Sequence, residues 1–155
     1  MRKSNYFSSK TQAGWPDLLE MEPYFLDPLK QGEFGTGSDG ATLTIEGVDG
    51  AEYLTDKHRL EIELEMWADR KHGVMLLYHK VDGRRQESYA SIGDLRRFRE
   101  YVQTQHGDDM PIALYIPFHK AWVAVKEFVV TDGELPKSIE WIAGEDLPPN
   151  TFPEP

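Results

Sequence analysis

The stretch IPFHKAWVAVKEFVVTDGELPKSIEW, residues 116–141, is the most clearly patterned part of the chain. Pro117 suits the first position of a helix, where its missing N–H costs no hydrogen bond. Gly133 suits a left-handed C-terminal cap, and residues 138–142 then alternate as a short strand. Apolar side chains recur at three- and four-residue steps, which is typical of one buried helix face: Phe118, Ala121, Trp122, Val125, Phe128 and Val129. We predict an amphipathic helix followed by a turn and a final strand.

Upstream of this helix the apolar pattern has a period of two. Residues 41–46 predict a first strand and residues 48–50 a turn, while residues 58–66 show the cleanest alternation of apolar and charged side chains. Residues 74–80 are more continuously apolar, as in a central strand. Asp82 and Gly83 predict a hairpin turn into another strand over 84–92. The predicted fold class is α+β, an antiparallel meander with the C-terminal helix packed on one face and a short final strand.

The chain length of 155 residues is most simply explained by one domain over 1–155. Within it we expect a loosely structured N-terminal segment at 1–40, a core at 41–142 and a proline-rich tail at 143–155. Prolines at 23 and 28 favour an extended segment over 23–29, although residues 15–21 can form a short helix. Residues 95–105 fit either a helix or a strand, and a turn at 106–109 before a strand at 112–116 favours the strand.

The charge balance narrows the class of partner. The chain has 27 acidic and 17 basic residues, for a net charge of −10. Phosphate binding needs a cationic surface, so nucleic acid is not expected as a partner. A basic protein partner would fit, because opposite charges accelerate association, and an acidic protein without such a partner remains the alternative. No signal peptide and no apolar stretch of ~20 residues is visible, so we expect a cytoplasmic protein without membrane contact.

The sequence offers little sign of catalytic chemistry. There is no cysteine for a disulfide, a thiol nucleophile or a zinc site, and no two of the five histidines stand at the helical spacing of a metalloprotease. No G-x-S-x-G elbow is present. We therefore expect no enzyme activity, no metal and no cofactor. A small enzyme whose site combines His79 with carboxylates stays open as an alternative.

The acidic alternation in the second strand is the best candidate for a binding surface. Glu61, Glu63 and Glu65 point to one side of the predicted strand, about 7 Å apart from one to the next. They form either the solvated outer face of the sheet or an acidic docking surface for a basic partner. Asp108 and Asp109 would extend such a surface, unless they serve only to form a turn.

The three large aromatic side chains of the C-terminal region are expected to be structural. Trp122, Phe128 and Trp141 each fall on a phase of their helix or strand that predicts burial. We therefore assign them to the core and not to a partner-binding surface.

The order of elements and the closing run resemble a family of bacterial immunity proteins that are encoded beside polymorphic toxins, particularly the group paired with deaminase toxins. The resemblance covers residues 41–141 and includes the characteristic tryptophan near the C-terminus, at Trp141. It rests on the following residues: Gly40-Ala41-Thr42-Leu43, Leu76-Leu77-Tyr78, Ile116-Pro117, Ala121, Val125-Lys126-Glu127-Phe128, Gly133, Leu135-Pro136 and Ile139-Glu140-Trp141.

The resemblance implies a non-catalytic α+β protein that binds a cognate toxin and blocks its active site. A deaminase toxin that acts on nucleic acid needs a cationic surface near its pocket, and a net charge of −10 suits an inhibitor that competes for that surface. An adaptor domain that binds an unrelated protein or peptide at a sheet edge remains a further alternative.

Overall fold

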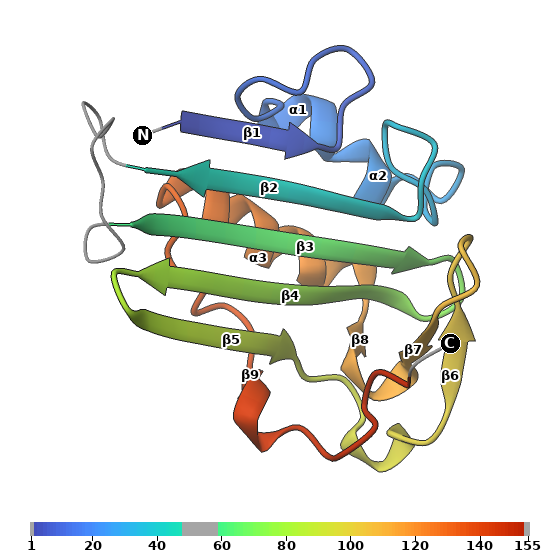
Figure 1. Cartoon of the computed structure of the whole chain (residues 1–155). Coiled ribbons are helices and arrows are strands. Elements are labelled where there is room, and N and C mark those ends of the chain that lie inside the picture. Colours follow the sequence, from blue (N-terminus) through green and yellow to red (C-terminus); the bar gives the residue numbers. More distant parts are fainter. Residues whose placement is uncertain (1, 48–58, 154–155) are drawn as a thin grey trace.

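The computed structural model of the protein describes residues 2–47 and 59–153 (Figure 1). Its main sheet has the spatial order β1-β2-β3-β4-β5-β9, and every strand pair is antiparallel. These strands are β1 (Arg2–Tyr6), β2 (Gly40–Glu46), β3 (Leu60–Asp69), β4 (Gly73–Asp82), β5 (Arg85–Ser91) and β9 (Trp141–Ala143). A seventh strand, β8 (Tyr115–Ile116), pairs with the start of β4. Strands that follow one another from β1 to β5 also pair with one another, so the predicted meander is confirmed.

The long helix covers one face of this sheet, as predicted (Figure 1). Helix α3 (Phe118–Val130) begins one residue after Pro117 and buries Ala121, Trp122, Val125 and Phe128 against the sheet. Two short helices, α1 (Leu18–Met21) and α2 (Pro23–Leu26), lie on the same side, and α2 packs on α3. The sequence-predicted α+β architecture is therefore correct.

The end of α3 has the predicted left-handed glycine, Gly133 with φ +99°, and a second left-handed residue before it. Asp132, with φ +54°, occupies the left-handed position after the helix, and the Gly133 N–H donates to the Phe128 carbonyl at 2.9 Å. Asp132 and Gly133 thus end the helix in a Schellman motif. Glycine is favoured at 133 because a φ of +99° strains any other residue, and a Cβ there would also lie 2.9 Å from Cδ1 of Ile45.

The alternating pattern of β3 separates an inner face from an outer face. Ile62, Leu64 and Met66 are buried toward α3, while the three glutamates between them point the other way. The inner rows continue across the sheet, as in the row Leu43, Leu64 and Tyr78. The inner face of β2, β3 and β4 and the apolar face of α3 thus form the main core.

The N-terminal forty residues are not loose, contrary to the prediction. Strand β1 pairs with β2 along its whole length, and Phe7, Met21 and Phe25 are completely buried. The Asn5 side chain holds the turn after β1, since its Oδ1 accepts from the N–H groups of Phe7 and Ser8. The segment predicted as extended contains α2, and the short helix predicted within residues 15–21 is present as α1, with Leu19 82% exposed. Most of β1 is polar because it is an edge strand, so it lacks the period-two signal.

A second, smaller core lies at one end of the outer face. Met75, Ala90, Leu114 and Tyr115 form it, together with partly buried residues of the hairpin β6 (Tyr101–Gln103) and β7 (Asp109–Pro111). The hairpin across 106–109 agrees with the prediction, but the segment before it begins with a 3-10 turn, η2 (Leu95–Arg97). The strand predicted at 112–116 is wrong in its first half, which forms the 3-10 turn η3 (Ile112–Leu114).

Of the described part of the predicted tail, residues 143–153, the first four residues have regular structure. The final strand lies at Trp141–Ala143, later than predicted, and continues into the 3-10 turn η4 (Gly144–Asp146). The turn predicted at residues 48–50 and the predicted strand start at His58 lie outside the described residues. Within the described ranges, no helix is long and apolar enough to cross a membrane.

Candidate partner-binding face

The outer face of the sheet is open along most of its width. Figure 1 shows α1, α2 and α3 behind the sheet, with the strands β1 to β5 in front of them. The cross-strand registers place polar side chains from all five strands on this outer side. We define the open face by these residues: Arg2, Ser4, Tyr6, Thr42, Thr44, Glu46, Glu61, Glu63, Glu65, His79, Val81, Gln86 and Ser88.

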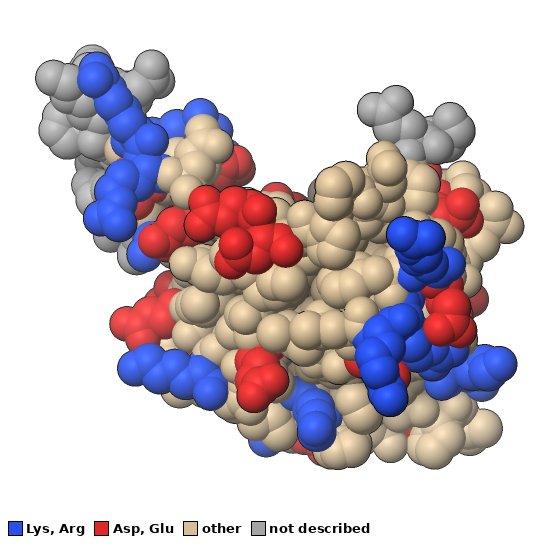
Figure 2. Space-filling view, turned by 90° about the horizontal axis from the view of Figure 1, so that it is seen from below, with Lys and Arg blue, Asp and Glu red and all other residues tan. Residues whose placement is uncertain are grey.

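Three carboxylates lie in the middle of the open face. Arg59 forms an ion pair with Glu61, and the Trp67 indole N–H donates to Glu65 Oε1 at 2.7 Å. Glu63, between them, has no hydrogen bond or ion pair of its side chain with any described residue. Figure 2, which looks at the molecule from the β5 side, shows a group of acidic side chains in the hollow at the upper left, on the open side of the sheet.

The environment of Glu63 disfavours its charged form. Partial burial raises the pKa of Glu63, and the charges of Glu65 and Glu61 act in the same direction, whereas His79 acts against them. A negative charge held under these conditions would be stabilised by a cation from outside the chain. Glu63 therefore lies where the carboxylates of this face are most crowded, between Glu61 and Glu65 on β3.

Local packing fixes the position of Glu65. Trp67 continues the outer side of β3, and its ring lies over the backbone of Gly40 in the neighbouring strand. A Cβ at Gly40 would lie 2.9 Å from Cζ3 of the indole, which is too close for any side chain. Gly40 thus allows Trp67 to lie flat and to direct its N–H at the carboxylate.

The structure brings His79 to the same carboxylates. His79 lies opposite Glu63 on β4, its Nδ1 is 3.0 Å from the Ser88 hydroxyl, and its Nε2 is 3.9 Å from Glu65 Oε2. The order Ser, His, Glu resembles a catalytic triad, but 3.9 Å is beyond hydrogen-bond range. These side chains lie on an open surface, where the His79 side chain is 43% exposed and that of Glu65 is 27% exposed. The arrangement offers a cluster of charges more than a reaction site.

Asp108 and Asp109 are not brought together with the three glutamates. They lie at the β6–β7 hairpin, beyond the Asp69 end of β3, whereas the glutamates begin at its other end (Figure 1). The hairpin is held there by Asp39, whose Oδ2 accepts from the Gln105 N–H at 2.9 Å. Both aspartates therefore lie beside the open face and are not part of it.

The three aromatic residues expected to be structural lie in or beside the main core. Trp122 and Phe128 are buried, and Trp122 stacks on Phe25. Trp141 is partly buried against Tyr78, and its indole N–H donates to the Pro136 carbonyl at 2.7 Å. The tryptophan near the C-terminus thus ties the turn after α3 to the sheet.

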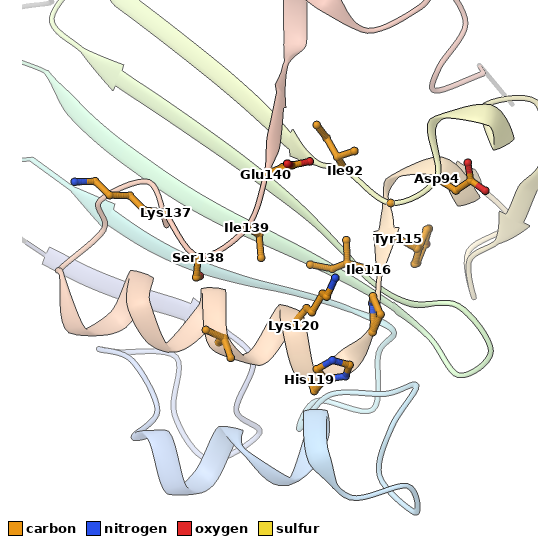
Figure 3. Close-up of a pocket in the computed structure, with 13 residues that line it drawn as sticks. Ile92, Asp94, Tyr115, Ile116, His119, Lys120, Lys137, Ser138, Ile139 and Glu140 are labelled. Atoms are coloured by element: carbon orange, nitrogen blue, oxygen red, sulfur yellow. The ribbon is translucent and has the colours of Figure 1, made fainter.

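A groove of about 720 Å³ lies on the other side of the molecule, between the start of α3, residues 92–94 and residues 137–140. Figure 3 shows Lys120 pointing toward Ile116 across this groove, whereas Lys137 points away from it. Asp94 is held by Arg96 through a side-chain hydrogen bond, which lowers the pKa of Asp94. The lining carries two lysines and two carboxylates, so its charge favours no class of ligand.

Metal-ligating side chains are scattered. Across residues 2–47 and 59–153, no three histidines or carboxylates lie close enough together to hold a metal ion.

Sequence reasoning found the acidic strand but missed several of its neighbours. The register between strands places Ser88 and Tyr6 on the open face, and this register cannot be derived from the sequence pattern. Trp67 had one usable signal, because it continues the phase of Glu61, Glu63 and Glu65.

Comparison with known families assigns the chain. The profile of the family described as Immunity protein Imm1 matches residues 37–143, which is more than half of the chain and spans β2 to β9. No curated protein and no solved structure matched the chain in the corresponding comparisons. The match agrees with the resemblance on residues 41–141, and its range includes the acidic strand β3, helix α3 and the turn that follows α3. The chain belongs to the Imm1 family of immunity proteins.

Proposed function

We propose that the protein neutralises a deaminase toxin by covering its cationic substrate groove with the open face. The family supplies the role of toxin-binding immunity protein. The class of toxin and the surface that binds it are our proposals. The protein acts by binding alone, so no cofactor and no catalytic residue takes part.

The observation that carries this proposal is the uncompensated charge at Glu63. Glu61 and Glu65 already have partners, Arg59 and Trp67, whereas the half-buried Glu63 carboxylate has none among the described residues. A toxin lysine or arginine placed over Glu63 would gain a charge-assisted contact and remove the repulsion between the glutamates. The net charge of −10 would speed the encounter over longer distances.

The resemblance to immunity proteins paired with deaminase toxins is the basis for proposing a deaminase, and charge complementarity supports a toxin that acts on nucleic acid. An enzyme that acts on nucleic acid presents a positive surface around its pocket, because the substrate backbone is negatively charged. Carboxylates spaced about 7 Å apart along β3 resemble the phosphates of a single strand in charge and spacing. An inhibitor with this face would compete directly with substrate. Asp108 and Asp109 would contact only the rim of such a complex.

The test uses the toxin domain encoded beside the gene of this protein. Its binding to the wild type is compared with binding to a variant in which Glu61, Glu63 and Glu65 are all replaced by Gln. We expect at least about tenfold slower association and a weaker dependence on salt for this variant, together with loss of protection in a deamination assay. A matched variant with Glu22, Glu134 and Glu140 replaced by Gln removes the same charge from exposed positions outside the open face.

Equal association rates for the two triple variants would refute the assignment of the open face. If the neighbouring toxin domain binds but has no deaminase activity, the face survives and the toxin class is wrong. If the toxin domain does not bind the wild type at all, both parts of the proposal fail.

A further inference from the structure

We propose that Tyr6 of strand β1 is a specificity-determining contact of the toxin-binding face, and that its ring packs against a cationic side chain of the toxin. This inference rests on the proposed function, because it takes the open face as the surface that binds the toxin. It concerns a part of the chain that the family match does not include, since the match begins at residue 37.

The strand register places Tyr6 beside the acidic centre. Tyr6 pairs with Thr42, and Thr42 pairs with Glu65, so the three side chains form one row on the outer side of the sheet. Two strand spacings separate Tyr6 from Glu65, which is roughly 10 Å between backbones. Thr42, between them, has a short side chain that leaves room above it. A lysine or arginine from a partner could lie over Thr42 and touch both the carboxylate and the ring.

The exposure of Tyr6 has no structural explanation. Its side chain is 46% exposed at the edge of the sheet, and its hydroxyl makes no hydrogen bond with any described residue. The neighbours Asn5 and Phe7 are buried and hold the strand in place. The backbone of Tyr6 is therefore held in place while its aromatic ring is exposed, and aromatic side chains of this kind dominate protein interfaces.

The partner chemistry follows from the same row. An aromatic face within ~6 Å of an ammonium or guanidinium group attracts it, and a nearby carboxylate adds to this attraction. Lys3 already uses this contact on the inner side of β1, where its Nζ lies 4.5 Å from the centre of the Trp15 ring. On the outer side of β1 the described cation, Arg2, is engaged with Glu46 at 2.9 Å, so we assign the cation over Tyr6 to the toxin.

The family match begins after β1. Its range, residues 37–143, spans β3 with its glutamates, whereas β1 (Arg2–Tyr6) precedes it. The segment is integral to the fold, since Phe7 and Phe25 belong to the main core. A face made of both strands can combine charge recognition at the glutamates of β3 with discrimination between partners at Tyr6 of β1.

The experiment compares Tyr6→Ala, Tyr6→Phe and Val130→Ala in binding to the toxin domain encoded by the adjacent gene, with separate measurement of association and dissociation. Val130 is a matched apolar control, because it is 71% exposed on α3, behind the sheet. We expect Tyr6→Ala to dissociate about tenfold faster, with an unchanged association rate, and Tyr6→Phe to stay within about threefold of the wild type. Thermal unfolding of each variant shows whether the fold is kept.

The outcomes separate the two proposals. If Tyr6→Ala dissociates at the wild-type rate while the triple glutamine variant of Glu61, Glu63 and Glu65 binds more slowly, the role of Tyr6 is refuted and the open face stands. If neither variant differs from the wild type, the open face is not the binding surface and both proposals fail. An equal loss in Tyr6→Ala and Val130→Ala would also refute the role of Tyr6, because it would reflect general destabilisation.

Discussion

The hydroxyl group of Ser91 is expected to be among the most important single polar groups for stability. It lies where β4 changes partner from β5 to β8, so the regular hydrogen-bond ladder is interrupted there. The Ser91 Oγ accepts from the Leu76 N–H at 2.9 Å and donates to the Leu114 carbonyl at 2.7 Å. All three residues are completely buried, so water cannot replace these bonds.

Replacing Ser91 by Ala leaves two buried backbone groups without a partner. Each such group costs about 1–3 kcal/mol, so we expect the free energy of unfolding to fall by about 3 kcal/mol. For a domain of 155 residues this corresponds to a decrease in Tm of roughly 6–12 °C. The loss comes from desolvated polar groups and not from a cavity, because only one oxygen atom is removed.

Equilibrium urea unfolding, followed by circular dichroism and tryptophan fluorescence, measures this difference. Ser88→Ala is the matched control, since Ser88 lies on the same strand but is exposed and its hydroxyl bonds to the His79 ring on the surface. We expect the control to stay within about 0.5 kcal/mol of the wild type. A Ser91→Ala variant as stable as the control would refute the reasoning that this hydroxyl replaces the missing part of the ladder.

Three further predictions concern Tyr78, Gly40 and Glu63. The buried Tyr78 hydroxyl donates to the Gly133 carbonyl at 2.8 Å, and burial raises the pKa of Tyr78 to about 12. Tyr78→Phe should therefore lower the free energy of unfolding in urea by about 1–2 kcal/mol, and an unchanged midpoint would contradict this. Gly40→Ala should displace the Trp67 indole, lower the free energy of unfolding by about 1–3 kcal/mol and shift the NMR signal of the indole N–H. An unchanged signal would show that the backbone of the strand moves and the indole does not. Because the folded-state pKa of Glu63 is raised, its ionisation destabilises the fold above that pKa, and the penalty disappears below pH 4.5. Glu63→Gln should therefore raise Tm at pH 7 but not at pH 4, and a lower Tm at pH 7 would be the contrary result.

The central fold was predictable because its elements repeat a simple period. Residues 60–66 alternate without a break, and the apolar face of α3 repeats at three- and four-residue steps, so burial on one side determines each element. The two-residue turn after β4 was nearly correct. It uses Gly83 and Arg84, one residue later than expected, because Asp82 pairs with Arg85.

The missed elements are those whose structure depends on distant contacts. Strand β1 is polar apart from Tyr6, and it becomes a strand because β2 offers an edge and Phe7 fills the core. Residues 112–114 read as a strand from their composition, but Gly93 approaches so closely that its N–H bonds to the Ala113 carbonyl. Neither contact leaves a local pattern in the sequence.

The candidate site was predictable only in part. The shared phase of Glu61, Glu63 and Glu65 follows from the period of a strand. Their neighbours depend on the register between strands, which is set by the turns and by packing on α3. This is why His79 and Tyr6 could not be placed beside the glutamates from sequence alone.

The proposed recognition of the toxin depends most directly on the charge of Glu63. The decisive measurement is the association rate of Glu63→Gln with the toxin domain encoded beside this gene, at two salt concentrations, with Glu134→Gln as a control that removes the same charge from an exposed position. We predict slower association and a weaker salt dependence for Glu63→Gln alone, although its Tm at pH 7 is not lower than that of the wild type. Equal rates and equal salt dependence for the two variants would contradict the account.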